Sequence, residues 1–379
     1  MPLIQLLISS IFIFFVLYAP QPLLAIFAQS FSVSTAASGA LMSITMIPLA
    51  IAPIFYGLLF ARKNPLSILK SAMLILALTS VLFALAPSFE LLLTLRFIQG
   101  LTLPAALTAM TGFIGQQYSG LQLQQNMTRY IGSTILGGYL GRVLAANFAS
   151  WFSWQSFYYL FAFVLLILAL CIKPHRCQPP ERAPASPKAY LKPLRNQLIV
   201  RLFGCVFCMF FCFAALMNYL PFILRDMFNI TDSKTIGWVY SGYLIGAIIS
   251  MATPRLNQYF NNPWRWLSTL FAIYCLTLMI MQIPLLSIFL VTFTLFCACM
   301  FMIHASAAPL ANKISDAPPT VTNGAYVSFY YSGGALGSFL PGLVLQHFGY
   351  HAFLFALLLV CAIGLQLTYM TYKQGTSIM

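Results

Sequence analysis

The chain has very few acidic residues. Its 379 residues include five Asp and Glu against 19 Lys and Arg, and only 6% of all residues are charged. A soluble globular protein carries roughly 25% charged residues, so these side chains cannot cover a water-facing surface of this size. The shortage excludes a soluble enzyme, a nucleic-acid-binding protein and a disordered chain. The net charge of +14 therefore needs an explanation other than a nucleic-acid partner.

Catalytic and metal-binding signatures are missing as well. The sequence has no HExxH, no GxSxG and no Walker A lysine loop, so we expect neither an enzyme nor an ATP-driven machine, and no cofactor. The nine cysteines lie mostly inside apolar runs without histidine or acidic neighbours, which predicts buried packing and no metal site. The first apolar run lacks a basic leader and a cleavage site, so we expect a helix that is retained.

What the chain has in abundance is apolar sequence, at 61% of its residues. Each apolar run is long enough for a helix that crosses a hydrocarbon core of about 30 Å. We therefore predict an all-α membrane protein with twelve transmembrane helices. The predicted helices span residues 4–28, 36–60, 66–87, 89–115, 127–149, 152–173, 198–223, 234–254, 264–283, 285–311, 321–345 and 349–372.

The basic residues predict the orientation. With the N-terminus placed in the cytoplasm, the outer loops hold only Arg225 and Lys234, and fifteen Lys and Arg fall on the inside. Cytoplasmic loops carry such an excess, so we expect both termini in the cytoplasm. The polar stretch 174–197 is basic and rich in proline, which predicts a cytoplasmic linker between six-helix bundles at 1–173 and 198–379.

The two predicted bundles share a weak internal repeat. Residues 31–34 (FSVS) and Gly39 parallel residues 228–231 (FNIT) and Gly237, at offsets of 197 and 198. Small residues let helices approach closely, either in tight packing or where helices slide. Two glycine clusters that we assign to helix packing or gating recur at an offset of 196: Gly137, Gly138 and Gly141, and Gly333, Gly334 and Gly337.

Two arginines, Arg96 and Arg142, lie inside predicted helices, about 9 and 12 Å from the nearer helix end. A charge at a membrane centre costs about 2.5–3.5 kcal/mol on insertion scales, and no predicted helix interior offers a carboxylate. In one interpretation these arginines brace helix ends through carbonyls and amides such as that of Gln99. In the other they face a wet cavity and bind an anionic substrate.

One histidine, His304, lies well inside a predicted helix. Histidine is the side chain that titrates near neutral pH in water, so we take His304 as the candidate for proton coupling, with a hydrogen-bonded core histidine as the alternative. The cavity-lining residues that we predict are Gln21, Arg96, Gln99, Arg142, Asn218, Tyr240, His304, Tyr326 and Tyr330.

Together these features resemble the major facilitator superfamily. The segment from Arg96 to Gly100 resembles the family's fourth-helix motif R-x-x-x-G, and residues 137–142 resemble the fifth-helix glycine motif of its exporters. Residues 18–24 and 328–338 are similar to the bacterial YnfM-like, arabinose-efflux-permease-like branch. Gly57 and Arg62 match the motif between helices two and three, where Ala61 replaces its aspartate. We assign Gly57, Arg62 and Gly100 to helix packing or gating, as we do the two glycine clusters.

The resemblance implies two pseudo-symmetric six-helix bundles around a central cavity. It further implies secondary active transport of a small solute across a bacterial inner membrane by alternating access, and we expect efflux coupled to protons. The alternative is a carrier, in either direction, of an anionic solute such as a carboxylate siderophore. A third alternative is a sensor or membrane enzyme. It would need an output domain or a catalytic cluster, and the sequence shows neither. As partners we expect a small-molecule substrate, protons and the lipid bilayer, no nucleic acid, and a monomeric protein.

Overall fold

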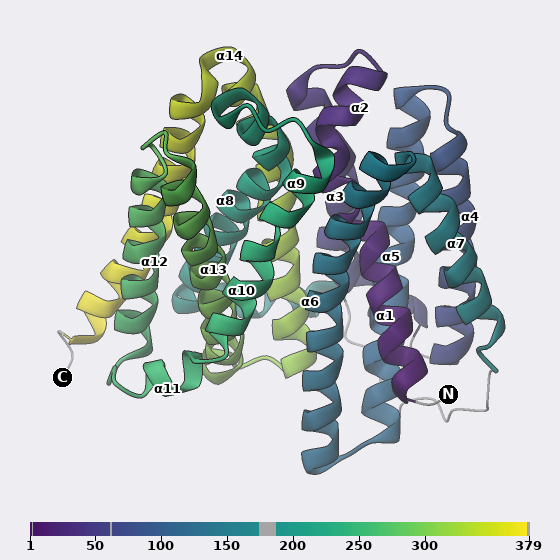
Figure 1. Cartoon of the computed structure of the whole chain (residues 1–379). Helices are drawn as coiled ribbons and strands as arrows, with labels where there is room; N and C mark the ends of the chain where they lie inside the picture. The colour runs from purple at the N-terminus through teal and green to yellow at the C-terminus, as the bar shows by residue number, and fades with distance from the viewer. Residues whose placement is uncertain (2, 61–62, 174–186, 377–379) are drawn as a thin grey trace.

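The computed structural model describes residues 1, 3–60, 63–173 and 187–376. The first half forms one helical bundle, on the right in Figure 1. Helix α1 continues through a short 3₁₀ turn, η1, into α2, so the first predicted segment is a single bent pass. The helices of this bundle are α1 (Leu3–Tyr18), η1 (Gln21–Leu23), α2 (Leu24–Ser30), α3 (Thr35–Phe60), α4 (Pro65–Leu85), α5 (Phe89–Gln117), α6 (Gly120–Trp151) and α7 (Trp154–Leu170).

The second half forms the other bundle (Figure 1). Its last helix is broken at Gly349, whose φ of 79° ends one helix and starts the next, so α14 contains two passes. Two 3₁₀ turns, η2 (Pro187–Leu191) and η3 (Pro193–Arg195), precede this bundle. Its helices are α8 (Gln197–Phe228), α9 (Ser233–Val239), α10 (Ser241–Ser250), α11 (Thr253–Asn257), α12 (Pro263–Ile280), α13 (Leu286–Ile314) and α14 (Pro319–Thr376).

The sequence specifies where several of these helices begin. A short polar side chain precedes each of them and accepts a hydrogen bond from a backbone N–H of the first turn, which would otherwise have no partner. Residues with this role are Asn64, Ser88, Ser153, Asn196, Asp232 and Asn262. All of these caps except Ser153 lie in the gaps between the predicted apolar runs, so the predicted order of passes is confirmed over the described residues.

Two predicted segments differ from the structure. Helix α6 begins at Gly120 rather than at 127, because the polar residues that precede the apolar run are themselves good helix formers. The segment predicted at 234–254 is divided into α9, α10 and the start of α11. Within the described part of the chain, eight helices are long and apolar enough to cross a membrane, and α14 is counted once among them. The linker prediction falls largely on residues 174–186, outside the described ranges, so the domain boundaries stay a prediction.

The two bundles repeat the same packing. Gly137 of α6 lies against the backbone of Ile11 in α1. Its counterpart Gly333 lies against the backbone of Phe207 in α8, and both residues of this second pair are 196 positions further along the chain. The pairs Gly141–Phe15 and Gly337–Phe211 show the same relationship. A Cβ at either α14 glycine would collide with a carbonyl oxygen, so the repeat corresponds to close helix packing.

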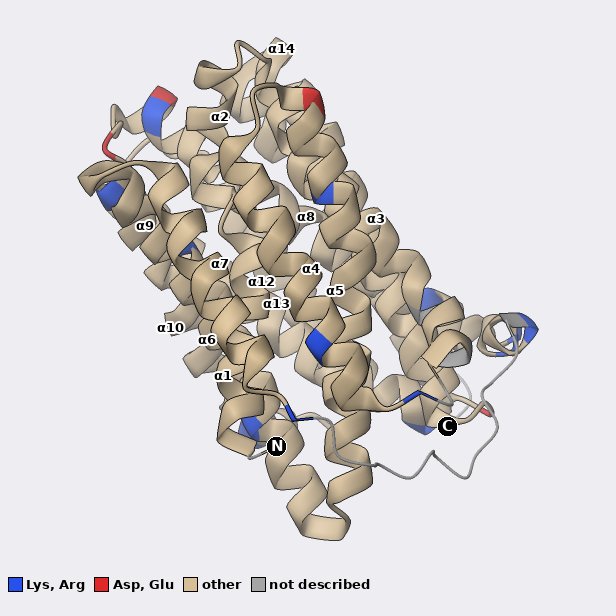
Figure 2. Cartoon of the chain, turned by 90° about the vertical axis from the view of Figure 1, so that its right-hand side faces the viewer, with Lys and Arg blue, Asp and Glu red and all other residues tan. Residues whose placement is uncertain are grey.

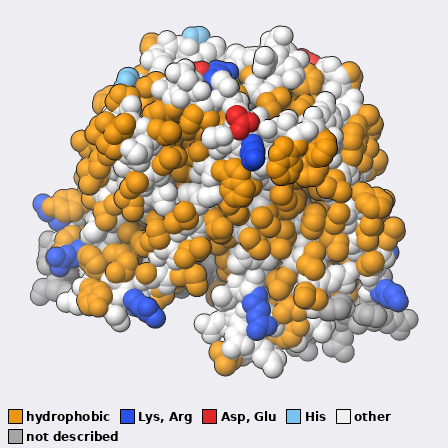
Figure 3. Space-filling view, in the orientation of Figure 1, with side chains coloured by type: hydrophobic (Ala, Val, Ile, Leu, Met, Phe, Trp, Pro, Cys, Tyr) orange, Lys and Arg blue, Asp and Glu red, His pale blue; other side chains and the backbone are white. Residues whose placement is uncertain are grey.

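The bundles touch mainly at one end. Both chain termini lie at the same end of the molecule, here called the terminal end, and the opposite end is the distal end (Figure 1). Lys and Arg gather toward the terminal end (Figure 2). The surface is notched between the two lobes at the terminal end (Figure 3). Hydrogen bonds that join the bundles in the distal half link Ala36 to Gln346, Ser43 to Ala335, Tyr139 to Ser241 and Ser150 to Asp232.

Candidate functional site

Arg96 of α5 braces the break that follows α1. Pro20 has no N–H, so the carbonyl of Val16 lacks the donor that a continuous helix would offer. Arg96 Nη1 donates to this carbonyl at 2.6 Å, and Nη2 donates to the carbonyl of Leu17 at 3.2 Å. Its Nε donates to the carbonyl of Leu41 in α3 at 3.1 Å. The side chain is fully buried, so one guanidinium ties α1 and α3 to α5.

Gln99 completes this arrangement. Its Oε1 accepts a hydrogen bond from Arg96 Nη1 at 2.9 Å, as the sequence suggested for an amide partner. With acceptors on α1, α3 and its own helix, Arg96 has the surroundings of a structural brace. The geometry therefore favours the bracing interpretation of Arg96 over the substrate interpretation.

Arg142 of α6 has different surroundings, at the contact between the bundles. Its side chain is fully buried. Nε donates to Gln21 Oε1 at 2.5 Å, and Nη1 donates to the carbonyl of Gly138 at 2.7 Å. Gln21 Nε2 in turn donates to Asn218 Oδ1 of α8 at 2.5 Å. A hydrogen-bonded chain thus runs from α6 through η1 into the second bundle.

Tyrosine rings take the place of a counter-ion for Arg142. Its guanidinium carbon lies 4.2 Å from the ring centroid of Tyr18, 4.6 Å from that of Tyr243 and 5.7 Å from that of Tyr240. The face of an aromatic ring attracts a cation, and the attraction is larger where water is excluded. Tyr18 belongs to the first bundle and the other two rings to the second. Both bundles therefore hold the same charge.

Within the described residues, no carboxylate pairs with Arg142, since the one ion pair found there joins Arg225 and Asp226. Three N–H groups of predicted cavity residues are buried without a hydrogen-bond partner: Arg142 Nη2, Asn218 Nδ2 and Gln99 Nε2. An unsatisfied buried donor costs about 1–3 kcal/mol. Two of these donors belong to the chain that crosses between the bundles, so this chain is suited to a ligand that offers acceptor oxygens.

Arg142 has no charged counterpart in the second bundle, although the residues around it repeat. At the offset of 196, Arg142 corresponds to Ser338 of α14. Ser338 Oγ donates to the carbonyl of Gly334 at 2.6 Å, just as Arg142 Nη1 donates to the carbonyl of Gly138. The first bundle thus carries a cation where the second carries a hydroxyl. A charge introduced at one of two equivalent positions indicates a specific role.

Tyr240 donates a hydrogen bond at a second place where a proline leaves a backbone carbonyl unpaired. Pro221 leaves the carbonyl of Met217 in α8 without its usual donor, and the Tyr240 hydroxyl donates to that carbonyl at 2.9 Å. The predicted cavity residue Tyr240 therefore uses its ring on Arg142 and its hydroxyl on the backbone of α8. Like Arg96 at the carbonyl of Val16, Tyr240 thus supplies a side-chain donor to a carbonyl that a proline leaves unpaired.

His304 lies on α13 in a separate aromatic group. Its Nδ1 is 2.8 Å from the hydroxyl of Tyr326, and its ring centroid is 5.2 Å from that of Tyr330. Tyr330 stacks on Phe210 with 3.6 Å between ring centroids. His304 and Tyr330 are only half-buried, unlike Arg142. They lie on the terminal side of the polar chain, so solvent reaches this group first.

The predicted cavity residues thus form three groups, and aromatic rings connect two of them. Tyr243, which covers Arg142, lies 5.1 Å from the ring of Phe301, one helical turn before His304 on α13. The first group consists of Arg142, Gln21, Asn218 and Tyr240. The second consists of His304, Tyr326 and Tyr330. The third consists of Arg96 and Gln99.

The predicted cavity list omitted Tyr18 and Tyr243. Their spacing could have identified them: Tyr243 is one turn after Tyr240, and Tyr18 is three residues before Gln21. The predicted packing residue Gly100 lies where the backbone of Thr45 in α3 approaches α5. Gly57 lies in α3, and Arg62 lies outside the described residues.

At the distal end, Asp232 joins the bundles through polar contacts. It accepts hydrogen bonds from the Thr235 hydroxyl at 2.7 Å and from the Thr235 backbone N–H at 2.9 Å. Ser150 of the first bundle donates to its other oxygen at 3.2 Å. These bonds, led by that of the Thr235 hydroxyl, hold the pKa of Asp232 below its ordinary value. The ionised form therefore favours the closed distal end.

Sequence comparisons agree with this architecture. A family model described as the Major Facilitator Superfamily matches residues 6–340. The chain is 24% identical over 343 residues to YybF, an uncharacterized MFS-type transporter of Bacillus subtilis, with 87% of this chain and 83% of the relative covered. It is 26% identical over 142 residues to the inner membrane transport protein YnfM of Escherichia coli, with 38% of this chain and 34% of that protein covered.

Solved structures share the fold. A bacterial homolog of the human lysosomal transporter Spinster, in an inward-facing and occupied conformation, superposes with a TM-score of 0.78 at 14% identity, covering 98% of this chain and 96% of that one. A variant of the nucleoside transporter NupG also gives 0.78 at 14% identity, covering 98% and 99%. The predicted all-α fold of two six-helix bundles is confirmed.

Proposed function

Because the chain belongs to the major facilitator superfamily and is a multi-pass membrane transporter, we propose that it exports a small anionic solute across a bacterial inner membrane. The observation that carries this proposal is Arg142. It is a fully buried cation between the bundles, it has no carboxylate partner among the described residues, and one of its N–H groups is unpaired. A carboxylate or phosphate oxygen on a solute would supply both the charge and the acceptor.

The contacts that hold Arg142 support alternating access. The second bundle supplies the Tyr240 and Tyr243 rings and, through Gln21, the Asn218 amide. If the distal end opens, these contacts are lost and the guanidinium needs another partner. A bound anion would supply it, so solute binding and distal opening would favour each other. This coupling is what a carrier requires.

The orientation that we propose puts both termini in the cytoplasm, on the basis of the positive-inside rule. The notched terminal end would then face the cytoplasm and the closed distal end the periplasm. A cytoplasmic anion would enter past the half-buried His304 and Tyr330 and reach the tyrosines over Arg142. The protein would thus be open to the inside.

The direction that we propose rests on charge. The membrane potential, negative inside, drives an anion outward with about 2.3 kcal/mol per charge per 100 mV. The described acidic residues all lie near helix ends or in loops, so a carboxylate proton relay is missing from the described helix interiors. Potential alone could therefore drive export of an anion.

Proton coupling is the second part of the proposal, and His304 carries it. Its hydrogen bond with Tyr326 and its partial exposure give it both a fixed orientation and access to solvent. A proton on His304 would also attract an anion on its way to Arg142. Uptake of an anionic solute such as a carboxylate siderophore is the alternative direction at the same site.

The experiment compares small solutes inside cells and in the medium for strains with the protein, without it and with Arg142→Gln, in iron-poor and iron-rich growth. We expect an anionic solute to build up inside cells that lack the protein or carry the variant. Arg129→Gln, on the exposed part of the same helix, is the matched control and should export normally. A neutral or cationic solute, or accumulation in the medium instead, would contradict the proposal.

A further inference from the structure

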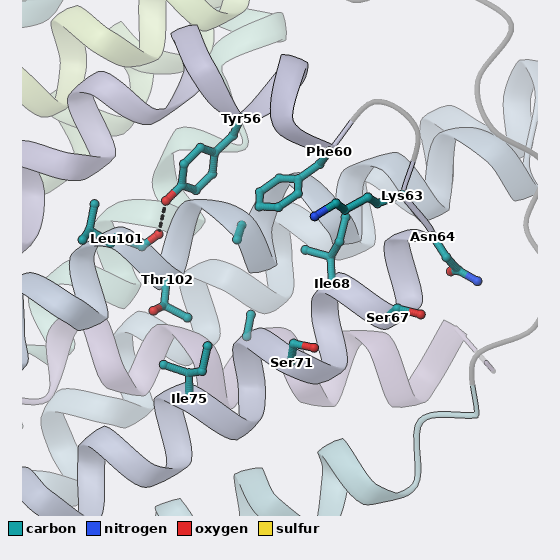
Figure 4. A pocket seen from close by; sticks show the side chains of 12 residues that line it. Tyr56, Phe60, Lys63, Asn64, Ser67, Ile68, Ser71, Ile75, Leu101 and Thr102 are labelled. Carbon is teal, nitrogen blue, oxygen red and sulfur yellow. Dashed lines mark hydrogen bonds between the residues drawn. The ribbon is translucent and has the colours of Figure 1, made fainter.

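A cavity lies in the first bundle, apart from the residues around Arg142 (Figure 4). It lies between α3, α4 and α5 and has a volume of about 600 Å³. Two of its lining residues, Ile75 and Leu101, are 44% and 43% exposed, so the cavity opens outward from the bundle. Since these helices cross the membrane, the opening faces lipid.

The lining changes character along α4. Toward the terminal end it has Lys63, Ser67 and Ser71. Further along, Ala72 and Ile75 of α4 face Ala105 of α5. Ser67 and Ile75 are separated by about 12 Å of helix at 1.5 Å per residue. The cavity is therefore polar and basic where the membrane surface lies and apolar toward the membrane centre.

Figure 4 shows the Lys63 amine directed toward the cavity, beside Phe60 and Ile68. None of the twelve lining residues is acidic. Within the described residues, no carboxylate forms an ion pair with Lys63. The Tyr56 hydroxyl donates to the carbonyl of Leu101 at 2.5 Å, so this tyrosine bridges α3 and α5 along one side of the cavity. The positive charge of Lys63 is thus available to an anion at the cavity opening.

We propose that this cavity binds one anionic phospholipid from the leaflet on the terminal side. The headgroup phosphate would meet Lys63 and Ser67, and an acyl chain would lie along Ile68, Ile75 and Leu101. A free phosphate would leave the apolar part of the cavity empty, and a neutral lipid would leave Lys63 without an anion. An amphiphile with a negative headgroup satisfies both parts.

This site is separate from Arg142 and does not depend on which solute is carried. Its test uses the purified full-length protein in detergent, titrated with phosphatidylglycerol and with phosphatidylcholine of the same chains, and bound lipid is counted by native mass spectrometry. We expect preferential binding of phosphatidylglycerol. Lys63→Gln should lower that binding about fivefold, the effect of one interfacial lysine on an anionic lipid, and Lys63→Arg should restore it.

Two further variants separate the parts of the site. Ile75→Trp, at an exposed position, fills the apolar end and should displace the lipid while Lys63 is intact. Lys313→Gln removes an exposed lysine at the same end of the other bundle and should leave binding unchanged. Equal binding of both lipids, no loss with Lys63→Gln, or displacement of the lipid by millimolar inorganic phosphate would overturn the proposal.

Discussion

Gln21 and Asn218 are hydrogen-bonded at 2.5 Å, and they are 197 residues apart. That separation equals the offset of the internal repeat at residues 31–34 and 228–231, so the two amides occupy equivalent positions in the two bundles. Equivalent residues can meet only close to the pseudo-two-fold axis between the bundles. Arg142 attaches to this pair from one side only. The charge therefore lies beside the axis about which the bundles would rock.

Arg96→Ala should destabilise the protein more than it impairs transport. The substitution removes a donor from three carbonyls and from Gln99. The carbonyl of Leu41 keeps the Thr45 hydroxyl, and leaving the other buried acceptors unpaired costs roughly 3 kcal/mol in sum. Thermal unfolding in detergent measures the loss, and Arg129→Ala on the surface of α6 should stay within about 0.5 kcal/mol of wild type. A stable Arg96→Ala protein with abolished transport would instead assign Arg96 to the substrate.

The α14 glycines should tolerate no side chain. In Gly333→Ala the new Cβ would collide with the carbonyl oxygen of Phe207, and overpacking of this kind costs about 1–3 kcal/mol. Gly112→Ala in α5 is the matched control, since its Cβ meets open space and alanine favours a helix by about 0.5–1 kcal/mol. The melting temperatures of the two variants should move in opposite directions. If both rise, α8 and α14 are not in close contact.

Acid should weaken the distal contact made by Asp232. Its pKa in the folded protein is lowered from the ordinary value of 3.8, so its contribution is fully present above that value and is lost as the pH falls through the lower folded pKa. The difference in melting temperature between wild type and Asp232→Asn should be largest above about pH 5 and shrink as the pH falls below 3.8. The effect is small because Asp232 is exposed to water. A difference for Asp232→Asn that grows as the pH falls would have the wrong sign and would remove Asp232 from the distal contact.

His304→Gln should separate the two driving forces. Glutamine can hydrogen-bond to Tyr326 but cannot carry a proton at neutral pH. In vesicles, transport driven by a pH gradient should fall at least tenfold in this variant, while transport driven by membrane potential should stay within about twofold of wild type. His347→Gln, at an exposed distal position, should change neither. Unchanged pH-driven transport in His304→Gln would exclude this histidine from coupling.

The sequence predicts the passes well because each needs about 20 apolar residues, and such runs are visible without knowledge of any contact. It does not predict the start of α6, whose first turns are polar. Nor could it distinguish Arg96 from Arg142. The difference depends on which carbonyls Pro20 leaves free and which helix faces meet, and neither can be deduced from composition or spacing.

The pairing of Gln21 with Asn218 also required the structure. The repeat offset identifies the two residues as counterparts, but only the tilt of the bundles decides whether counterparts meet. Tyr18 and Tyr243 escaped the prediction for a related reason, since their contact with Arg142 depends on which helix faces meet.

The most direct test of the central claim is the current that the reconstituted protein carries. Solid-supported membrane electrophysiology on proteoliposomes would compare wild type, Arg142→Gln and Arg129→Gln over a panel of small carboxylates, phosphates and their neutral analogues. We predict current with at least one anion and none with its neutral analogue, a loss of at least tenfold in Arg142→Gln, and wild-type current in Arg129→Gln. Equal currents in wild type and Arg142→Gln, or transport of the neutral analogue alone, would contradict the account.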